Sequence, residues 1–396
     1  MKQLDKRIFS ALFFSIFSAV MGVGIVVPLL PVYAETLGAS GFYIGFIFSV
    51  FSLSRTILLP VFGHLSDKSG RKPYITIGLM GYALVSLAFM RTDTITGLII
   101  VRFFQGIASA MIMPVAQAYI GDITPKDKEG FTMGLFNLSV FGSLSLGPIF
   151  GGLLKDSWGI DAAFIGMGVL SLAGCLLSLF FLPPRKEEYA VLRGSRPASW
   201  PALLRDKSLH GLFLFRFVYV FCIGTLWCFL PILAGGLGLS GTRTGVLVML
   251  GVLVSGLLQV PMGMLADNTN KRRMAVTGGL IVAGAIFSFE WAAGFWELFT
   301  ASIVFGIGGG IAMPPVMAMA VVKGDSAGAM GATMSLMTMA HSMGMFFGAL
   351  LAGLAMDFFS LRHSFPLAGI IMLSGTALFA IFTRRMADKT INPDKP

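Results

Sequence analysis

Four side chains that can bind an anion or a proton interrupt long apolar stretches of this sequence. They are Arg55, Arg102, Arg216 and His341. A guanidinium stays protonated and presents a planar set of donors, which suits bidentate binding of a carboxylate or phosphate. An imidazole titrates near neutral pH, so His341 is a candidate proton carrier. The alternative for His341 is a neutral ring that shares a hydrogen bond with a neighbouring helix.

The arginines have no obvious acidic partners. All 19 carboxylates fall in loops, in tails or near helix ends. A charge deep in an apolar helix is costly and is expected to face the protein interior. For Arg55 and Arg102 this favours a role in binding a substrate or in coupling. Arg55 has a structural alternative, in which it binds the carbonyl groups of a broken helix, and Arg216 is expected to extend toward the inner lipid headgroups.

Neutral polar and aromatic side chains occur in the same stretches. Gln105 is a candidate hydrogen-bonding residue for a substrate, and Tyr219 and Trp227 are candidates to lie beside it. The methionine-rich runs 313–319 and 330–345 suit varied apolar ligands, because the methionine side chain is flexible. Packing against lipid explains these runs equally well.

The apolar stretches predict an all-α integral membrane protein. Of the 396 residues, 56% are hydrophobic and 12% are charged, whereas about 25% are charged in an ordinary soluble protein. A helix needs about 20 apolar residues to cross the bilayer. Twelve stretches meet this length: 8–32, 42–65, 73–90, 96–120, 131–153, 162–183, 211–235, 243–265, 274–291, 297–321, 329–355 and 365–383.

The chain is predicted to consist of two homologous six-helix bundles. Residues 1–183 form the first and residues 211–396 the second, which ends in a short cytoplasmic tail; the polar segment 184–210 links them. Short sequences recur at an offset of about 200 residues: Gly63 and Asp67 match Gly263 and Asp267, and Asp156 matches Asp357. Two such repeats are typical of transporters that work by alternating access.

The distribution of basic residues predicts the orientation. With the N-terminus in the cytoplasm, the inner segments hold 22 Lys and Arg residues and the outer loops hold 4. The positive-inside rule therefore places both termini and the linker in the cytoplasm, as for a multi-pass protein of the cytoplasmic (inner) membrane. The net charge of +10 is explained by this distribution, so we do not expect nucleic acid as a partner.

Two segments in the first half carry recognisable motifs. Residues 63–73 read GHLSDKSGRKP between the second and third helices, and residues 102–106 read RFFQG in the fourth. The first closely resembles the inner-loop signature of the major facilitator superfamily, and the second resembles the helix-4 element of that family. The resemblance implies a cytoplasmic latch formed by Asp67, Arg71 and Asp122, with Gly63 and Gly70 at its turns.

The fifth helix resembles the antiporter motif of the drug:proton antiporter branch. The matching residues are Gly147, Pro148, Gly151 and Gly152. The resemblance implies that the Gly-Pro pair kinks the helix and that the small residues let helices 5 and 8 approach closely. One position departs from the branch: exporters often carry an acid in helix 1 where this chain has Ala19. That departure puts proton coupling in question.

Three functions compete at this stage. The first is export of small amphipathic molecules by alternating access, with protons as a candidate coupling ion. The second is transport of an anionic solute or lipid, favoured by the membrane arginines. The third is a non-transporting receptor or membrane enzyme, which the sequence disfavours because no catalytic, metal-ligand or nucleotide-binding motif occurs. We expect a monomer without a cofactor, whose partners are a small-molecule substrate and the bilayer.

Overall fold

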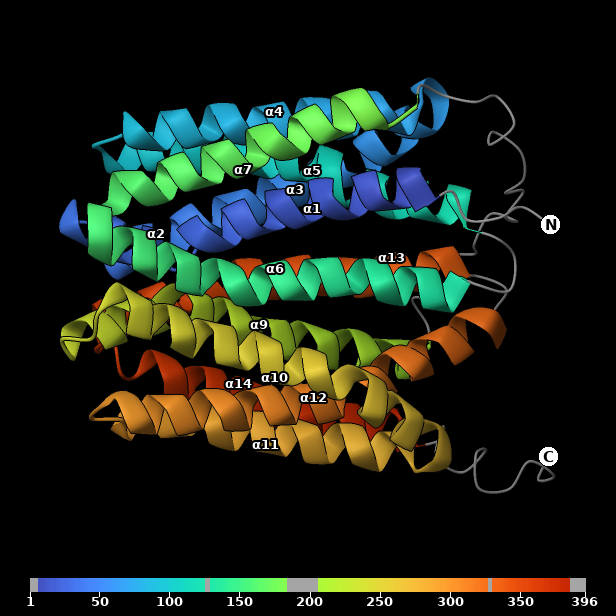
Figure 1. Ribbon diagram of the computed structural model, residues 1–396. Helices are drawn as coiled ribbons and strands as arrows, with labels where there is room; N and C mark the ends of the chain where they lie inside the picture. The colour runs from blue at the N-terminus through green and yellow to red at the C-terminus, as the bar shows by residue number, and fades with distance from the viewer. Residues whose placement is uncertain (1–5, 125–128, 184–205, 327–329, 385–396) are drawn as a thin grey trace. The chain divides into compact units, whose positions relative to one another are not determined.

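The computed structural model describes residues 6–124, 129–183, 206–326 and 330–384 (Figure 1). Within these ranges the regular secondary structure is helical, and twelve spans are long and apolar enough to cross a membrane. The predicted all-α membrane fold is confirmed. Most of the expected linker, residues 184–205, lies outside the described residues.

Among the described residues, the first half of the chain forms seven helices and the second half six. They are α1 (Lys6–Val26), α2 (Leu30–Thr36), α3 (Gly41–Ser69), α4 (Arg71–Met90), α5 (Ile95–Ile123), α6 (Glu129–Trp158), α7 (Ile160–Phe181), α9 (Lys207–Gly236), α10 (Gly241–Asn268), α11 (Lys271–Trp291), α12 (Phe295–Ser326), α13 (Met330–Phe358) and α14 (Ser364–Phe382).

The first expected span is two helices rather than one. The sequence predicts a single helix over residues 8–32, but α1 ends at Val26 and α2 begins at Leu30. Pro28 lies between them and has no N–H to donate, and its ring would clash with the carbonyl group four residues earlier. Together α1 and α2 still make one span, Lys6–Thr36.

Contacts divide the chain into two units. Unit 1 comprises residues 1–39, 46–192 and 234–249, and unit 2 comprises residues 40–45, 193–233 and 250–396. The first turn of α3 therefore belongs to unit 2, and the first turns of α10 belong to unit 1.

In unit 1, α1 packs against α6 and α7, and α4 packs against α5 and α7. Small hydroxyl side chains join these helices. Ser15 Oγ on α1 donates to the Gly174 carbonyl on α7 at 3.1 Å, and Ser86 Oγ on α4 donates to the Phe164 carbonyl at 2.6 Å. Such contacts are expected because lipid-embedded helices associate through close packing and hydrogen bonds rather than through apolar burial.

In unit 2, α11 packs against α12 and α14, and α13 packs against α12 and α14. A Cβ on Gly278 of α11 would lie 2.7 Å from the Gly308 carbonyl oxygen of α12, so glycine sets the spacing of this pair. Ser364 Oγ on α14 donates to the Ala352 carbonyl on α13 at 2.8 Å.

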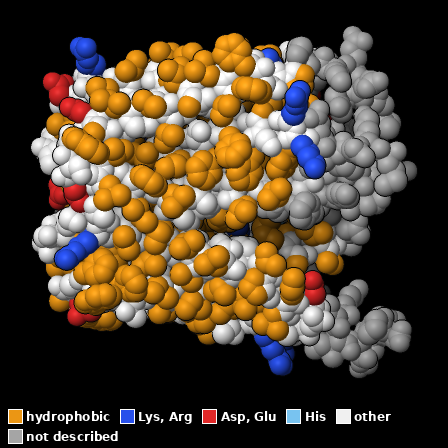
Figure 2. Space-filling view, in the orientation of Figure 1, with side chains coloured by type: hydrophobic (Ala, Val, Ile, Leu, Met, Phe, Trp, Pro, Cys, Tyr) orange, Lys and Arg blue, Asp and Glu red, His pale blue; other side chains and the backbone are white. Residues whose placement is uncertain are grey.

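The surface matches a membrane environment. In Figure 2 hydrophobic side chains cover the length of the helices, and charged side chains gather toward their ends. Trp158, Trp291 and Trp296 are exposed at the end of α6, the end of α11 and the start of α12. Exposed tryptophans at helix ends are typical of the interface between hydrocarbon and water.

Candidate functional site

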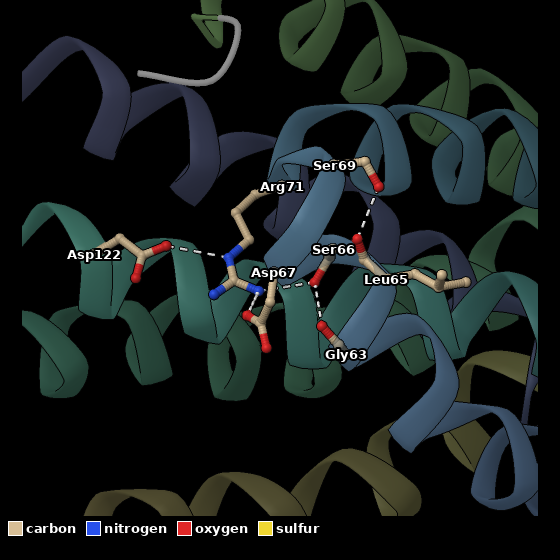
Figure 3. A network of polar contacts seen from close by, with 7 residues as sticks. All are labelled: Gly63, Leu65, Ser66, Asp67, Ser69, Arg71 and Asp122. Carbon is tan, nitrogen blue, oxygen red and sulfur yellow. Dashed lines mark hydrogen bonds and ion pairs between the residues drawn. The ribbon is translucent and has the colours of Figure 1, made fainter. Parts of the chain in front are cut away.

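Arg71 is the centre of a polar network at the turn between α3 and α4. Its Nη1 atom lies 2.5 Å from Asp67 Oδ1, and its Nε atom donates to Asp122 Oδ2 at 3.1 Å. Nη1 also donates to Ser66 Oγ at 2.8 Å. Figure 3 shows the guanidinium between the carboxylates of α3 and α5. The structure therefore brings together the three residues that the sequence predicts for the latch.

Two glycines of the motif have different environments. Gly70 precedes α4 with φ of 95°, a conformation that favours glycine, and this turn places Arg71 at the first position of α4. Gly63 has open space where a Cβ would stand, so close approach does not explain it. Its carbonyl oxygen accepts from Ser66 Oγ at 2.8 Å, which holds the serine against Arg71.

Arg102 is buried between α3 and α5. Its Nε donates to the Ile47 carbonyl oxygen of α3 at 3.2 Å, and its Nη1 donates to Gln105 Oε1 at 2.7 Å. The guanidinium carbon lies 4.9 Å from the ring centre of Phe48 and 4.5 Å from that of Phe51. These contacts help to compensate the burial of the guanidinium. Arg102 and Gln105 thus bind each other inside unit 1.

Gly106 explains why the helix-4 motif ends in glycine. A Cβ at this position would collide with Ser54 Oγ and the Phe51 carbonyl oxygen of α3. The absence of a side chain lets α5 approach α3, and that approach brings Arg102 within reach of the Ile47 carbonyl.

Arg55 has a different environment from Arg102. It is the fifteenth of 29 residues in α3, so it lies about 21 Å along the axis from either end. Its Nε atom is buried and has no hydrogen-bond partner. The side chain lies near the hydroxyl group of Tyr82 on α4. A polar N–H that is shielded from water and unbonded costs stability, so this position is not explained by packing alone.

The glycines of the fifth-span motif mark two close helix contacts inside unit 1. A Cβ on Gly147 would lie 2.7 Å from the Gly24 Cα of α1, and one on Gly151 would collide with the Ile25 carbonyl. A Cβ on Gly152 would collide with Gly241 at the start of α10. Gly245 of α10 similarly lies against the Pro148 carbonyl. The start of α10, which belongs to unit 1, therefore lies close to α6.

Sequence reasoning recognised Asp156 and Asp357 as a repeat but missed what they bind. Asp156 at the end of α6 accepts from the backbone N–H groups of Gly241 and Thr242 at 2.9 and 2.8 Å. Asp357 at the end of α13 accepts from those of Gly41 and Phe42 at 2.6 and 2.8 Å, inside unit 2. Each carboxylate caps the N-terminus of a helix, where unpaired N–H groups favour an anion. The sequence signal that could have identified these two caps is the offset of about 200 residues at which both the aspartates and the helix starts recur.

The remaining predicted residues lie in unit 2, on α9 and α13. The Tyr219 ring is buried and stacks on Phe305 with centroids 6.1 Å apart, and Trp227 lies two turns further along α9, half-buried. His341 on α13 lies beside Arg216, with Nδ1 3.4 Å from Arg216 Nη2. Arg216 therefore turns toward α13, and the expectation that it extends to the inner headgroups is wrong.

No grouping suited to a metal ion occurs in the described part of the chain, where three His, Cys, Asp or Glu side chains nowhere come together. The described carboxylates lie at or near helix ends, as the sequence indicated. Ala19, at the position where related exporters carry an acid, is fully buried.

Comparison with known families agrees with the motifs. The family model described as Major Facilitator Superfamily matches residues 12–226 and again residues 212–396. The chain belongs to the Major Facilitator Superfamily. Members of this superfamily are transporters of small molecules, so the chain is a multi-pass membrane transporter and not an enzyme.

Relatives of this major facilitator protein include drug-resistance transporters. It is 24% identical to Multidrug resistance protein 2 of Bacillus subtilis, over 97% of each chain. It is 26% identical to the quinolone resistance protein NorA of Staphylococcus aureus, over 89% of this chain and 91% of that one. The resemblance to the multidrug exporter branch is therefore confirmed.

A solved structure shows the same fold. A bacterial homologue of the human lysosomal transporter Spinster superposes with a TM-score of 0.83 at 14% identity. The match covers 97% of this chain and 98% of that one. At this identity the likeness is one of fold.

Proposed function

We propose that this chain exports small amphipathic molecules by alternating access. The observation that carries the proposal is the antiporter motif on α6, whose Gly152 packs against the backbone at the start of α10. The two relatives named for multidrug and quinolone resistance support the same function. In this proposal residues 1–183 and 211–396 act as the two bundles, and the protein works as a monomer.

The proposal includes an orientation and a latch. The 22 inner and 4 outer basic residues support cytoplasmic termini and an inner-membrane location. The network of Asp67, Arg71 and Asp122 would then lie on the cytoplasmic side and stabilise one conformation. In the transport cycle this network would form and break as the two bundles alternate.

The test is transport by the purified full-length protein in proteoliposomes. Matched aromatic dyes that are cationic, neutral and anionic are supplied with and without an imposed pH gradient. We expect at least one dye to accumulate in protein-containing vesicles, faster with the gradient than without it. Empty vesicles and vesicles with the Asp67→Ala variant are the controls. Transport of a sugar or nucleoside but of no amphipathic dye would contradict the proposal.

A second candidate, transport of an anionic solute or lipid, is favoured by Arg55. Its Nε has no partner at the middle of α3, and a substrate carboxylate or phosphate would supply one. Arg55→Lys retains the charge but cannot reproduce the planar set of donors, so it should weaken transport about as much as Arg55→Ala. Equal transport of a permanently cationic dye by the original protein and both variants would reject this candidate.

A further inference from the structure

Arg55 lies on the side of α3 that faces the interior of unit 1. Leu53 and Ile57, two residues away in each direction, are 43% and 60% exposed. Two residues correspond to about 200° around a helix, so Arg55 lies opposite this exposed apolar stripe. On its own side, a Cβ on Gly106 of α5 would lie 3.2 Å from the Arg55 backbone nitrogen. The hydroxyl of Tyr82 on α4 lies near its side chain. Arg55 therefore lies among α3, α4 and α5.

The Arg55 side chain has unused hydrogen-bonding capacity in this place. Its Nε atom is buried and has no partner. The side chain as a whole is half-buried, so other atoms of it remain accessible. A shielded N–H of a charged group that lacks a partner is costly. An unpaired donor and accessible surface on the inner side of a membrane helix indicate a binding position for an acceptor.

Tyr82 supplies a second hydrogen-bonding group beside Arg55. Tyr82 is 5% exposed, and its hydroxyl lies within hydrogen-bonding reach of the Ser109 hydroxyl on α5. A phenolic hydroxyl accepts one hydrogen bond and donates another. When Ser109 donates to it, Tyr82 can give its own proton to an acceptor next to Arg55. Arg102 also lies near the Tyr82 hydroxyl, so two guanidinium groups make this part of unit 1 electropositive.

No described carboxylate of unit 1 lies at the depth of Arg55, which is the middle of α3. Each of them lies in a loop or within about one turn of a helix end. They are Glu35, Asp67, Asp93, Asp122, Asp156 and Asp161. Apart from Arg55 and Arg102, the described Lys and Arg residues of this unit are distributed in the same way. On α3 itself, His64 and Asp67 are nine and twelve residues from Arg55, about 14 and 18 Å along the helix.

The second repeat builds the same helices without these groups. Helices α10, α11 and α12 begin 200 residues after α3, α4 and α5. At this offset the counterparts of Arg55, Tyr82 and Arg102 are Ser255, Val282 and Ser302. The fold therefore does not require a guanidinium in the middle of this helix. A charge that is costly to bury and that the fold does not require indicates a function.

We propose that Arg55 and Tyr82 bind the acidic group of an amphipathic anion, a carboxylate, sulfonate or phosphate, inside unit 1. This rests on the proposed export function, because it names the chemical class of the exported molecule. The anion first meets the accessible part of Arg55, and a rotation of the side chain lets Nε complete a planar pair of donors to two oxygens. Tyr82, held by Ser109, donates to one of these oxygens.

Charge determines which molecules the site accepts. The guanidinium of Arg55 stays protonated, so the site offers only donors to the head group of the substrate. An anionic head group offsets the positive charge of Arg55. A cationic head group would add a third positive charge near Arg55 and Arg102, in a region where charges interact strongly. The site therefore selects amphipathic anions over neutral molecules and excludes amphipathic cations.

Binding is measured with the full-length protein in nanodiscs, and binding to empty nanodiscs is subtracted. The anionic probe is 2-naphthalenesulfonate, which keeps its charge at every pH used. Its neutral match is 2-naphthalenesulfonamide, and its cationic match is (2-naphthylmethyl)trimethylammonium. We expect the sulfonate to bind about tenfold or more tightly than the sulfonamide, because hydrogen bonds to charged groups are the stronger ones. Equal binding of the sulfonate and the sulfonamide, or tighter binding of the cation, would overturn the site.

Variants test the two members of the site separately. Arg55→Lys should weaken sulfonate binding about as much as Arg55→Ala, by about tenfold or more, because an ammonium cannot reproduce the planar donors. Tyr82→Phe should weaken it by about threefold to tenfold. Neither Arg55→Lys nor Tyr82→Phe should alter sulfonamide binding by a similar factor.

The matched control is Arg91→Lys, since Arg91 is exposed in the loop after α4. It should bind the sulfonate as the original protein does. Thermal melting verifies that each variant is folded. Sulfonate binding by folded Arg55→Lys within twofold of the original protein would contradict the proposal. A parallel loss of sulfonate and sulfonamide binding in that variant would contradict it as well, because it would indicate a structural role.

Two sources of the anionic group are distinguished by competition. Water-soluble dihexanoylphosphatidylglycerol is added to the protein with bound 2-naphthalenesulfonate, and dihexanoylphosphatidylcholine serves as the uncharged match. Displacement by the glycerol lipid assigns the site to a lipid headgroup, and no displacement by either lipid assigns it to a free solute. Dye transport in proteoliposomes is measured separately. Loss of anion selectivity with intact dye transport would remove only the site, whereas Arg55-dependent binding without any dye transport would remove only the export function.

Discussion

Asp156 binds Thr242 twice: its Oδ2 atom accepts from the backbone N–H at 2.8 Å and from the side-chain hydroxyl at 2.6 Å. The carboxylate at the end of α6 thereby caps the N-terminus of α10. The repeat of this arrangement in unit 2, Asp357 with Phe42, has only the backbone bonds. The cap in unit 1 is therefore the more completely hydrogen-bonded of the two.

We expect Asp156→Asn to destabilise the protein by about 1 kcal/mol, the usual contribution of a helix cap. The amide keeps one acceptor oxygen but loses the charge that interacts with the helix dipole. Thr242→Val should cost less, because the backbone bond to Asp156 remains. Thermal melting of the purified variants measures both. A melting temperature of Asp156→Asn equal to that of the original protein would show that the cap does not contribute.

The Arg71 network should matter more for transport than for folding. Asp67 is mostly exposed, with 59% of its side-chain surface accessible, so its ion pair adds little stability. Asp67→Ala should therefore reduce dye transport while membrane insertion and melting stay normal. Ser69→Ala is the matched control, since Ser69 bonds Leu65 and Tyr74 but not Arg71. Normal transport by Asp67→Ala would remove the latch role.

Arg55 and Arg102 should respond oppositely to substitution by lysine. Arg102 donates to Ile47 and Gln105 and lies over two rings. Arg102→Lys should lower stability by about 1.5–3 kcal/mol, as expected when hydrogen bonds to a charged group are lost. Arg55→Lys loses no bond of Nε, so its melting temperature should change little while transport falls. Melting temperatures and initial transport rates of the two variants test this expectation. A loss of stability in Arg55→Lys together with a loss of transport alone in Arg102→Lys would contradict it.

The sequence predicted the elements better than the surroundings of their polar residues. Twelve spans follow from hydropathy, because bilayer thickness fixes the length of an apolar helix. The contact of Arg71 with Asp67 and Asp122 was implied by the resemblance of residues 63–73 to the inner-loop signature of the superfamily. Arg102 and Arg216 are different cases. Whether such a side chain bonds a carbonyl, a glutamine or a histidine depends on which face of which helix packs beside it, and hydropathy does not encode that register.

An ion pair at the start of α9 provides a pH test. Lys323 Nζ lies 2.8 Å from Asp206 Oδ2. Burial opposes ionisation of Asp206, but hydrogen bonds from Lys323 and from the Ser208 N–H outweigh it and lower the pKa of Asp206. A lowered pKa in the folded state adds stability above the unfolded value, near 3.9, and that stability is lost as the pH falls toward the folded pKa.

Asp206→Asn should therefore lower the melting temperature at pH 7, and the difference from the original protein should shrink below about pH 4. The effect is expected to be under about 1 kcal/mol, because both partners are partly exposed. Lys323→Met should give a similar loss at pH 7. A double variant that loses no more than either single one would confirm the pairing, and full additivity would contradict it.

The glycines of α6 allow a test within a single helix. A Cβ on Gly152 would collide with the backbone of Gly241, whereas the nearest atom to one on Gly142 is a Phe17 ring carbon at 3.8 Å. Gly152→Ala should therefore destabilise the protein by about 1–3 kcal/mol, as overpacking does, or push α10 away and slow transport. Gly142→Ala should be neutral or slightly stabilising, since alanine favours the helix. Melting and dye transport are compared for the pair, and equal behaviour of the two would show that the close approach at Gly152 does not matter.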